Sequence, residues 1–535
     1  MERFDTIIVG GGSAGCVLAE RLSASGTARV LLLESGPSDR SPWIHMPAGY
    51  GKLFHHPTLN YRFETEEQTE LGDRRNYYPR GHVIGGSGAI NAMVYCRGLP
   101  RDFDAWTETG VTGWGWRDVQ PVFDKIETQV APDGSTTGNG PIHISDVRGQ
   151  IHPLNRHFFA GLDECQLPRT DNINDPVGEG GTVYRINTKN GRRWSSAQAF
   201  LGPARRRMNL EVRTQAQVSK ISIESGRATG VVVEWRGQTH RIAAGQVILS
   251  AGAVHSPAIL QRSGIGPGNL LAEHGISVIH DNPHVGGNLQ DHLGVNYYFK
   301  SREPSLNNTL SPWYGKLLAG MRYVLTRKGP LSLSVNQCGG FFRSSPAQDR
   351  PDQQLYFNPV TYTTTKVGTR TIVRPDPFPG FILGFQPCHP TSRGRIDITG
   401  TRHSDAPRVQ PNSLSTEEDR DAVIDGGRLC ARIMKAPALV ELVTEPMYCD
   451  IRAMEDAEIL EDFRQRCGTV FHPVSTCRMG DDPTQSVTDS RLRVHGIEGL
   501  RVVDASVFPK ITSGNTNAPT MMLAYRAAEM ILADG

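Results

Sequence analysis

The sequence predicts an α/β fold in which discontinuous segments build a doubly wound, mostly parallel sheet, and a second domain carries an antiparallel sheet flanked by helices. A strand, glycine turn, helix and strand open the chain over residues 1–36. Two further strand–turn–helix units lie far along the chain, near residues 246–262 and 500–532. The intervening stretch 298–460 is rich in proline and contains polar–apolar alternation such as Arg395–Ile398, which is typical of an antiparallel sheet.

The first unit is defined by hydrophobic periodicity. Residues 6–9 form a short apolar run that predicts a buried strand, and residues 30–33 predict the next one. Between them, residues 14–23 place Val17, Leu18 and Leu22 on one helical face. This strand–turn–helix–strand order is half of a doubly wound sheet.

The later units repeat this order. Residues 246–250 predict a strand that is followed by a turn and a helix over 257–262. Residues 500–504 predict another strand, and a final helix follows over about 519–532. Since these units are far apart in sequence, we expect them to assemble into one discontinuous nucleotide-binding domain.

The length of 535 residues exceeds what one hydrophobic core usually organises, so two packed domains are expected. We assign the nucleotide-binding domain to residues 1–154, 205–297 and 462–535. The substrate domain is assigned to residues 155–204 and 298–461.

Composition excludes several classes of protein. With 38% hydrophobic and 21% charged residues the chain is typical of a soluble globular protein, and a net charge of +2 does not favour a nucleic-acid partner. No apolar run of about 18 residues predicts a membrane span. The nine cysteines are scattered without a CxxC pair, so neither a metal site nor a disulfide framework is expected. The first strand begins too early to leave room for a signal peptide, which predicts a cytoplasmic location.

The turn after the first strand fits the pattern G-x-G-x-x-G. Gly10 permits the tight turn, Gly12 lets the backbone approach a pyrophosphate, and Gly15 allows close packing of helix on strand. Ser13 and Ala14 open the helix, whose N-terminus favours an anion. Glu34 ends the second strand, where a carboxylate accepts hydrogen bonds from an adenosine ribose. The motif predicts a dinucleotide but does not distinguish FAD from NAD, and a glycine turn without a ligand is the less favoured alternative.

Five blocks of sequence carry further information. The block 79–91 has a glycine density that lets the main chain approach a flat or charged ligand, although a flexible loop explains it equally well when it is taken alone. The other blocks are 252–266, 471–480, 503–506 and 513–520.

The glycine turn followed by these blocks, in their order along the chain, resembles the glucose-methanol-choline (GMC) oxidoreductases, especially the bacterial alcohol and choline dehydrogenase-like branch. The resemblance runs from Ile7 to Met530, and the segment Val285–His292 matches a further family segment. It implies the GMC fold, FAD as the cofactor, and oxidation of an alcohol by hydride transfer to the flavin N5.

Two kinds of departure from the family are visible. His82 stands where the family usually has Arg or Lys, and Gly88 stands where a second Ser is common. Ile90 occupies the position at which some members attach FAD through a histidine, so FAD is expected to be bound non-covalently. Motif and resemblance together predict these cofactor-binding residues: Gly10, Gly12, Ser13, Ala14, Gly15, Glu34, Gly86, Ser87, Asn91, Ala92, Val218, Ala251, Gly252, Asp504, Ala505, Asn517 and Thr520. Val218 is equally well explained as an ordinary strand residue.

The resemblance also implies a catalytic pair. His472 matches the family's active-site base, since a neutral imidazole accepts the proton of an alcohol near neutral pH. Asn517 matches its partner, which donates an amide hydrogen to the alcohol oxygen but cannot take the proton. Asn515 is a rival, because both asparagines precede the last helix. If that helix N-terminus points at the flavin, its positive end stabilises the anionic reduced cofactor.

The leading hypothesis is FAD-dependent oxidation of a primary alcohol to an aldehyde, with oxygen or a quinone-type acceptor taking the electrons. A hydroxynitrile lyase-like enzyme without net redox and a non-catalytic flavoprotein are the alternatives. Phe385 and Phe471 are the candidate substrate-pocket residues, in a set with Trp313, Tyr314 and Phe381 that core packing explains equally well. The alcohol, the acceptor and a homo-oligomeric state are left open.

Overall fold

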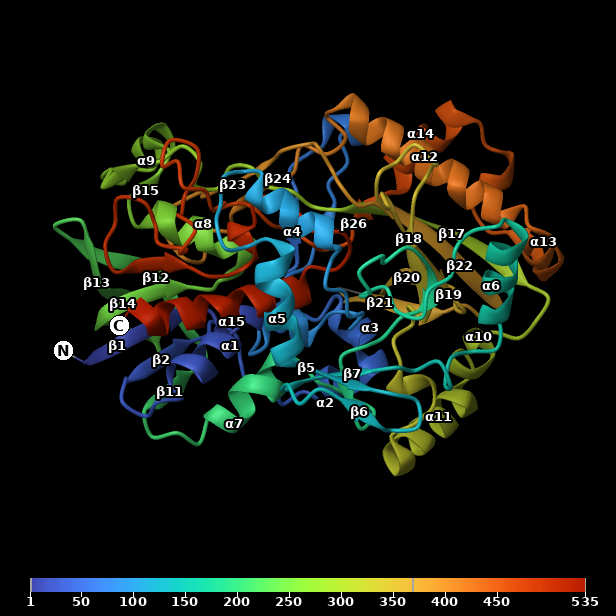
Figure 1. Cartoon of the computed structure of the whole chain (residues 1–535), viewed down its shortest axis with the longest axis horizontal. Helices are drawn as coiled ribbons and strands as arrows, with labels where there is room; N and C mark the ends of the chain where they lie inside the picture. Colours follow the sequence, from blue (N-terminus) through green and yellow to red (C-terminus); the bar gives the residue numbers. More distant parts are fainter. Residues whose placement is uncertain (1, 368–369, 535) are drawn as a thin grey trace.

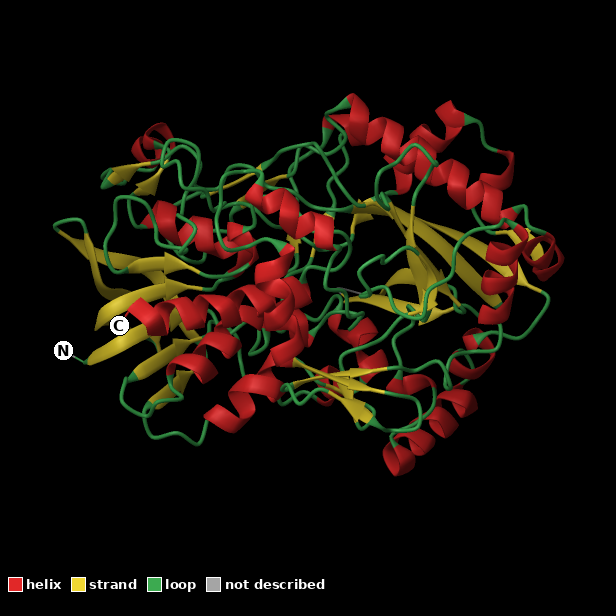
Figure 2. Cartoon of the chain, in the orientation of Figure 1, coloured by secondary structure: helices red, strands yellow, loops and turns green. Residues whose placement is uncertain are grey.

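The computed structural model describes residues 2–367 and 370–534. The molecule is elongated, with one large sheet towards each end and helices packed around both (Figures 1 and 2). Each sheet has its own hydrophobic core of buried side chains. Two cores are what a chain of this length is expected to need.

Sheet 1 contains all the strands of the predicted nucleotide-binding units. Its order is β11-β2-β1-β14-β13-β12, and β27 pairs with β14. The strands β11, β2, β1, β14 and β27 run parallel, whereas β12, β13 and β14 form an antiparallel meander. The predicted doubly wound sheet of discontinuous segments is confirmed. The strands are β1 (Arg3–Val9), β2 (Val30–Leu33), β11 (Leu210–Arg213), β12 (Ala216–Glu224), β13 (Arg227–Trp235), β14 (Gln238–Leu249) and β27 (Leu500–Val502).

Three helices cover sheet 1, namely α1 (Ser13–Leu22), α8 (Gly252–Arg262) and α15 (Asn517–Asp534). Helix α15 lies alongside α1 (Figure 1). Helix α8 begins earlier than the predicted 257–262, although Pro257 lies inside it. Proline cannot donate a hydrogen bond to the carbonyl four residues before it. The Thr476 hydroxyl donates to that carbonyl, on Ala253, at 2.6 Å and so satisfies it.

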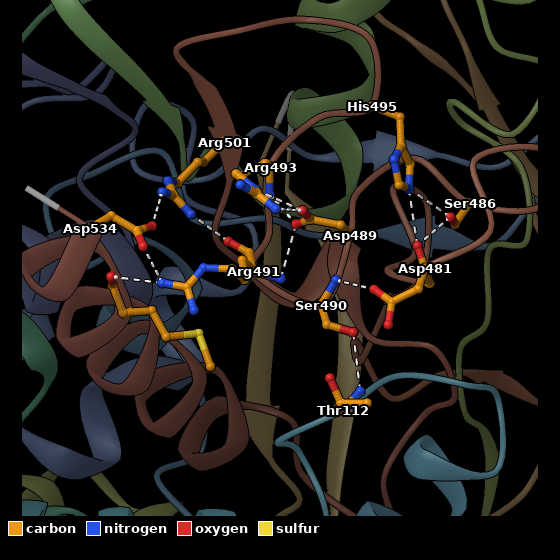
Figure 3. A network of polar contacts seen from close by, with 12 residues as sticks. Thr112, Asp481, Ser486, Asp489, Ser490, Arg491, Arg493, His495, Arg501 and Asp534 are labelled. Carbon is orange, nitrogen blue, oxygen red and sulfur yellow. Dashed lines mark hydrogen bonds and ion pairs between the residues drawn. The ribbon is translucent and has the colours of Figure 1, made fainter.

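The C-terminal end of α15 is held by a network of charges (Figure 3). Asp534 accepts hydrogen bonds from Arg491 and Arg501, and Arg501 also donates to the Arg491 carbonyl at 2.6 Å. Arg493 pairs with Asp489 in the same loop. These contacts tie the end of the last helix to the loop that leads into β27.

Sheet 2 is antiparallel throughout, in the order β25-β17-β22-β19-β18-β8, with β26 paired to β17. Its flanking helices include α6 (Asn155–Glu164), α12 (Glu417–Met434), α13 (Pro437–Leu442) and α14 (Asp456–Arg466) (Figure 1). The predicted antiparallel sheet flanked by helices is therefore confirmed. The strands are β8 (Gly180–Val183), β17 (Leu293–Ser301), β18 (Cys338–Phe342), β19 (Gln353–Asn358), β22 (Gly380–Pro387), β25 (Val443–Pro446) and β26 (Gly468–Thr469).

Sheet 2 does not contain the segment whose alternation suggested it. Arg395–Asp397 forms β23, which pairs only with β24 (Arg408–Gln410) in a separate two-stranded sheet. The domain bounds drawn from the sequence stay a prediction. Strand β17 of sheet 2 begins at Leu293, within the segment that we assigned to the other domain.

The remaining elements are short, apart from an 11-residue helix, α5, and a 14-residue helix, α11. No helix in the described part of the chain is both long enough and apolar enough to cross a membrane. The helices are α2 (Pro42–His45), α3 (Tyr50–Leu53), α4 (Pro100–Thr107), α5 (Trp116–Ile126), α7 (Gly202–Ala204), α9 (Gly268–Glu273), α10 (Leu306–Leu310) and α11 (Trp313–Thr326). The strands are β3 (Phe63–Glu64), β4 (Tyr77–Tyr78), β5 (Glu127–Val130), β6 (Thr136–Thr137), β7 (Ile142–Ser145), β9 (Thr188–Lys189), β10 (Arg192–Arg193), β15 (Ile265–Gly266), β16 (His280–Asp281), β20 (Tyr362–Val367) and β21 (Arg370–Pro375).

Truncation of Leu32 tests the core of sheet 1. This residue is fully buried in β2, between Ile8 and Val212 of the neighbouring strands. Leu32→Ala is expected to lower the free energy of unfolding by about 3 kcal/mol, because it removes buried methyl groups and leaves a cavity. Urea unfolding followed by circular dichroism measures this. Met208→Ala, at a fully exposed side chain, is the control and should change little; equal effects of the two variants would contradict the role of Leu32.

Candidate active site

A single cavity of about 1230 Å³ connects the two halves of the molecule. One end is lined by the glycine turn after β1 and by Glu34 after β2. The rest of its wall includes His472, residues of sheet 2 such as Phe385, and residues of α11 (Trp313–Thr326). Ligand pockets usually occupy roughly 300–1,000 Å³. The cavity is therefore large enough for a dinucleotide and a second small molecule.

Two glycines of the turn leave no room for a side chain. A Cβ added to Gly10, whose φ is +104°, would lie 2.4 Å from the Ser250 carbonyl oxygen. A Cβ on Gly15 would lie 1.9 Å from the Gly10 carbonyl oxygen. Helix α1 begins directly after Gly12, which has no side chain to cap the free amides. This geometry fits an anionic pyrophosphate at the helix N-terminus.

Glu34 both lines the cavity and supports the glycine turn. Its carboxylate accepts a hydrogen bond from the Gly11 amide at 2.7 Å and another from the Gly36 amide at 2.7 Å. Burial raises the pKa of Glu34 to about 6, against the lowering effect of these two amides. The carboxylate therefore holds the shape of the turn as well as offering an acceptor to a ribose.

The glycine-rich block 79–91 packs against the glycine turn. A Cβ on Gly86 would lie 2.8 Å from the Gly12 Cα. The Ser87 hydroxyl accepts a hydrogen bond from Arg80 at 2.7 Å and one from the Gly81 amide at 3.1 Å. The interpretation of this block as a flexible surface loop is wrong, because it is held between buried elements.

Arg193 holds the end of this block. Its guanidinium is buried and donates to the Asn91 side chain at 2.7 Å and to the Asn91 carbonyl at 2.6 Å. It also donates to the carbonyls of Ile44 and Gly88. The sequence carried no local signal for this residue, because its partners lie about 100 to 150 positions earlier in the chain.

Nearly all the predicted cofactor-binding residues line this one cavity. Gly15 does not; it lies beneath the turn, where the helix packs on the strand. Asp504 accepts hydrogen bonds from the Gly252 amide at 2.8 Å and from Ser256 at 2.6 Å, so it braces the start of α8. The lining residues are Gly10, Gly12, Ser13, Ala14, Glu34, Gly86, Ser87, Asn91, Ala92, Val218, Ala251, Gly252, Asp504, Ala505, Asn517 and Thr520.

Beyond the glycine-turn end of the cavity, His472 lies in a chain of buried hydrogen bonds. Its Nδ1 lies 3.0 Å from Nδ1 of His292, and Nε2 of His292 lies 2.8 Å from the Cys388 carbonyl oxygen. Its own Nε2 lies 3.1 Å from the Asn515 amide nitrogen. The backbone amide of His472 donates to Asp291 at 2.8 Å.

These contacts determine which nitrogen of His472 is basic. The Cys388 carbonyl can only accept, so Nε2 of His292 carries a hydrogen and its Nδ1 accepts. Nδ1 of His472 must then donate, which leaves the lone pair on Nε2, beside Asn515. Burial lowers the pKa of His292 to about 4. Burial, with smaller effects of His292 and Arg80, lowers the pKa of His472 well below its ordinary value.

The two candidate asparagines occupy different positions. Asn515 lies beside His472, and its buried side-chain oxygen has no hydrogen-bond partner among the described residues. Asn517, which we favoured from the motif, accepts a hydrogen bond from Ser13 at 2.7 Å and so faces the glycine turn. Helix α15 begins at Asn517, and the carbonyl of Thr516 accepts its first hydrogen bond.

The aromatic residues near the site divide into three groups. Phe385 and Phe471 line the cavity. Phe381 is buried in the core of sheet 2. Trp313 and Tyr314 are exposed on α11, so their inclusion in an aromatic-lined pocket is wrong.

Sequence reasoning missed the support around His472. Asp291 and His292 were inside a segment matched to the family but received no role. Phe471 has a φ of +72°, an uncommon backbone conformation for a bulky residue, and Arg80 donates to its carbonyl at 2.9 Å. Such strain at a cavity wall is typical of a functional site, yet it leaves no sequence pattern.

Comparison with known proteins agrees with this geometry. Two protein-family sequence models, both described as GMC oxidoreductase, match this chain. The first matches residues 4–294 and the second matches residues 390–524. The chain is 40% identical to an alcohol dehydrogenase [acceptor] from Pseudomonas putida, over 99% of this chain and 96% of the relative. It is 39% identical to an oxygen-dependent choline dehydrogenase from Vibrio vulnificus, over 99% and 94% respectively. The crystal structure of pyridoxine 4-oxidase from Mesorbium loti superposes with a TM-score of 0.87 at 31% identity, covering 99% of each chain.

The cofactor follows from the family and from the fit of the cavity. The glycine turn leaves backbone amides for a pyrophosphate, Glu34 offers a carboxylate acceptor next to it, and the cavity continues to His472. FAD is the cofactor of this chain. The family resemblance is confirmed: the chain belongs to the GMC oxidoreductase family, whose enzymes oxidise CH–OH donors with FAD.

Proposed function

We propose that this enzyme oxidises an uncharged primary alcohol to an aldehyde, with His472 as the base and oxygen or a quinone-type acceptor taking the electrons. The observation that carries the proposal is the buried lone pair on Nε2 of His472, which faces the cavity beside Asn515. FAD, when bound, accepts the hydride from the carbinol carbon. The protein residues bind the alcohol and move its proton.

His472 takes the hydroxyl proton. Nδ1 already donates to His292, so Nε2 is the nitrogen whose lone pair can accept the proton. Once protonated, His472 keeps the hydrogen bond to His292, because His292 still accepts from Nδ1, whereas Nε2 no longer accepts from the Asn515 amide nitrogen. His292 and Asp291 act as positioning residues: the first sets the tautomer, and the second holds the backbone amide of His472.

Asn515 orients the alcohol. Its amide nitrogen, 3.1 Å from Nε2 of His472, lies within reach of an oxygen that approaches that nitrogen. Its unpartnered side-chain oxygen leaves a buried acceptor for a second hydrogen bond. For Asn517 we propose a cofactor-binding role instead, because it contacts Ser13 at the start of α1. There the positive end of α15 also favours negative charge on the bound cofactor.

The charges of the cavity favour an uncharged alcohol over a cation such as choline. Among the described lining residues only Glu34 and Asp504 are acidic, and both follow strands of sheet 1, at the glycine-turn end. The charged lining residues elsewhere are Lys52, Arg80, Lys316, Arg374 and Arg466. A quaternary ammonium group would find no carboxylate among the described lining residues near His472, since Asp291 does not line the cavity, and these cations would repel it.

Removal of the base tests the proposal. His472→Ala is expected to slow reduction of the flavin by an alcohol by roughly 10²–10⁴-fold, the usual loss for a general base. Stopped-flow loss of flavin absorbance under anaerobic conditions, over a panel of benzylic and aliphatic alcohols, gives this rate. Retained flavin absorbance before mixing shows that the variant still binds FAD. If the variant bleaches its flavin as fast as the wild type, the proposed base is wrong.

The two asparagines are separated by paired substitutions. Asn515→Ala is expected to lower the rate constant of flavin reduction by about tenfold or more with normal FAD content, because the alcohol loses its orienting donor. Asn517→Ala is expected to lower FAD content first, because it removes the contact to Ser13. Flavin-to-protein absorbance ratios and stopped-flow rates distinguish the two. The reverse pattern would restore Asn517 as the catalytic partner.

The pH profile tests the buried imidazole. The base must be neutral, and a pKa well below the ordinary 6.5 keeps His472 neutral throughout the neutral range. We therefore expect the limiting rate of flavin reduction to stay flat from about pH 8 to about pH 6 and to fall only at more acid pH. Stopped-flow reduction across this range measures the profile. An ascending limb with an apparent pKa near 7 or above would contradict the expectation.

A further inference from the structure

Helix α11 carries more exposed large hydrophobic side chains than any other described element. Seven of the fifteen large hydrophobic side chains that are exposed in the described chain belong to it. Their exposed fractions run from 46% for Met321 to 82% for Leu325. Contiguous exposed apolar patches on soluble proteins usually mark a contact surface. The seven residues are Trp313, Tyr314, Leu317, Leu318, Met321, Val324 and Leu325, and we call them the apolar face of α11.

The apolar face points away from the protein. The helix buries only Gly315, Ala319 and Tyr323, which follow one another at intervals of four and form a single stripe. At about 100° per residue, the seven exposed apolar residues fall within an arc of about 140° on the opposite side. Gly315 lets the helix approach α10 closely, since a Cβ there would lie 2.2 Å from the Thr309 carbonyl oxygen. Figure 1 shows α11 projecting at the edge of the molecule.

The charged residues of α11 and of the segment around it are all cations until Asp349. No aspartate or glutamate occurs from Pro304 to Gln348. Lys316 and Arg322 lie on either side of the apolar arc, and Arg327 and Lys328 follow the helix; all four are exposed. None of the four forms an ion pair with another described residue. An outward apolar face bordered by unpaired cations, with Trp and Tyr at one end, is typical of a helix that lies in a membrane interface.

We propose that α11 docks this enzyme onto the surface of an anionic phospholipid bilayer. The apolar face enters the boundary between headgroups and acyl chains, and the four cations lie over the headgroup phosphates. A second copy of the chain fits this face less well. A two-fold contact through α11 would bring the same cations together, and the segment from Pro304 to Gln348 offers no carboxylate to pair with them.

The docking face adjoins the opening of the active-site cavity. Val324 lines the cavity although it is 65% exposed, so the cavity reaches the surface beside α11. Lys316 and Tyr323 of the same helix also line it, as do Ile372 and Arg374 of strand β21. Docking through α11 therefore brings the cavity opening to the lipid surface.

The test measures binding of the FAD-loaded protein to sedimenting vesicles. We expect the wild type to bind vesicles of phosphatidylcholine with about one third phosphatidylglycerol in about 0.1 M salt, and to bind pure phosphatidylcholine more weakly. The triple variant Leu317→Ser/Leu318→Ser/Leu325→Ser should lose at least about tenfold in partitioning. None of these three residues lines the cavity, so alcohol oxidation without vesicles should be unchanged.

A second variant isolates the charge. Arg322→Gln/Lys328→Gln should bind anionic vesicles more weakly and depend less on salt, since both cations lie outside the cavity. The matched control Val177→Ser/Met208→Ser, at exposed apolar residues elsewhere, should bind like the wild type.

Three outcomes would overturn the proposal. In the first, the wild type stays in the supernatant with both kinds of vesicle. In the second, the leucine variant partitions like the wild type. In the third, light scattering shows a dimer that the leucine variant abolishes while neither protein binds vesicles, which would assign the apolar face to a second copy. Vesicle binding does not require turnover, so its failure is distinct from failure of the proposed alcohol oxidation.

Discussion

The buried hydrogen-bond chain from the Cys388 carbonyl through His292 and His472 to Asn515 is the interaction on which the site depends. Its members come from both halves of the molecule. Cys388 follows β22 and His292 precedes β17, so both lie at the same end of two neighbouring inner strands of sheet 2. Asn515 precedes α15, which packs over sheet 1. The reactive nitrogen is therefore oriented only when the two sheets are packed together around the cavity.

Burial favours the neutral form of both imidazoles in this chain of hydrogen bonds. Two imidazoles with Nδ1 atoms 3.0 Å apart cannot both carry a charge away from water, and burial lowers the pKa of each. A carbonyl at one end fixes the direction of every hydrogen in between. The main chain before His472 is strained, because Phe471 has a left-handed backbone conformation. The Asp291 carboxylate holds it in place by accepting a hydrogen bond from the His472 amide. Local strain is thus balanced by hydrogen bonds that start in distant elements.

The parts of the molecule that were predictable from sequence are those governed by local backbone chemistry. Gly10 and Gly15 were correctly interpreted because a close backbone approach permits no Cβ, and apolar runs identified the parallel strands. The choice between Asn515 and Asn517 depends on which side chain the turn before α15 directs towards His472. That direction is set by packing against Ser13 and His472, from segments far away in the chain. Periodicity also could not tell whether an apolar helix such as α11 is covered.

The distribution of charge along the cavity favours a different ligand at each end. The carboxylates of Glu34 and Asp504 lie at the glycine-turn end, where they hold the amides of the turn and of α8. The open end is bordered by cations such as Lys316 and by apolar side chains such as Val324, with no carboxylate among its described lining residues. The middle, at His472, is buried and holds a neutral base. A dinucleotide is thus favoured at one end by amides and a helix dipole, whereas a molecule that enters from the other end meets apolar surface before it reaches the base. Because α11 borders that entrance, whatever covers the apolar face of α11 lies directly beside the path to His472.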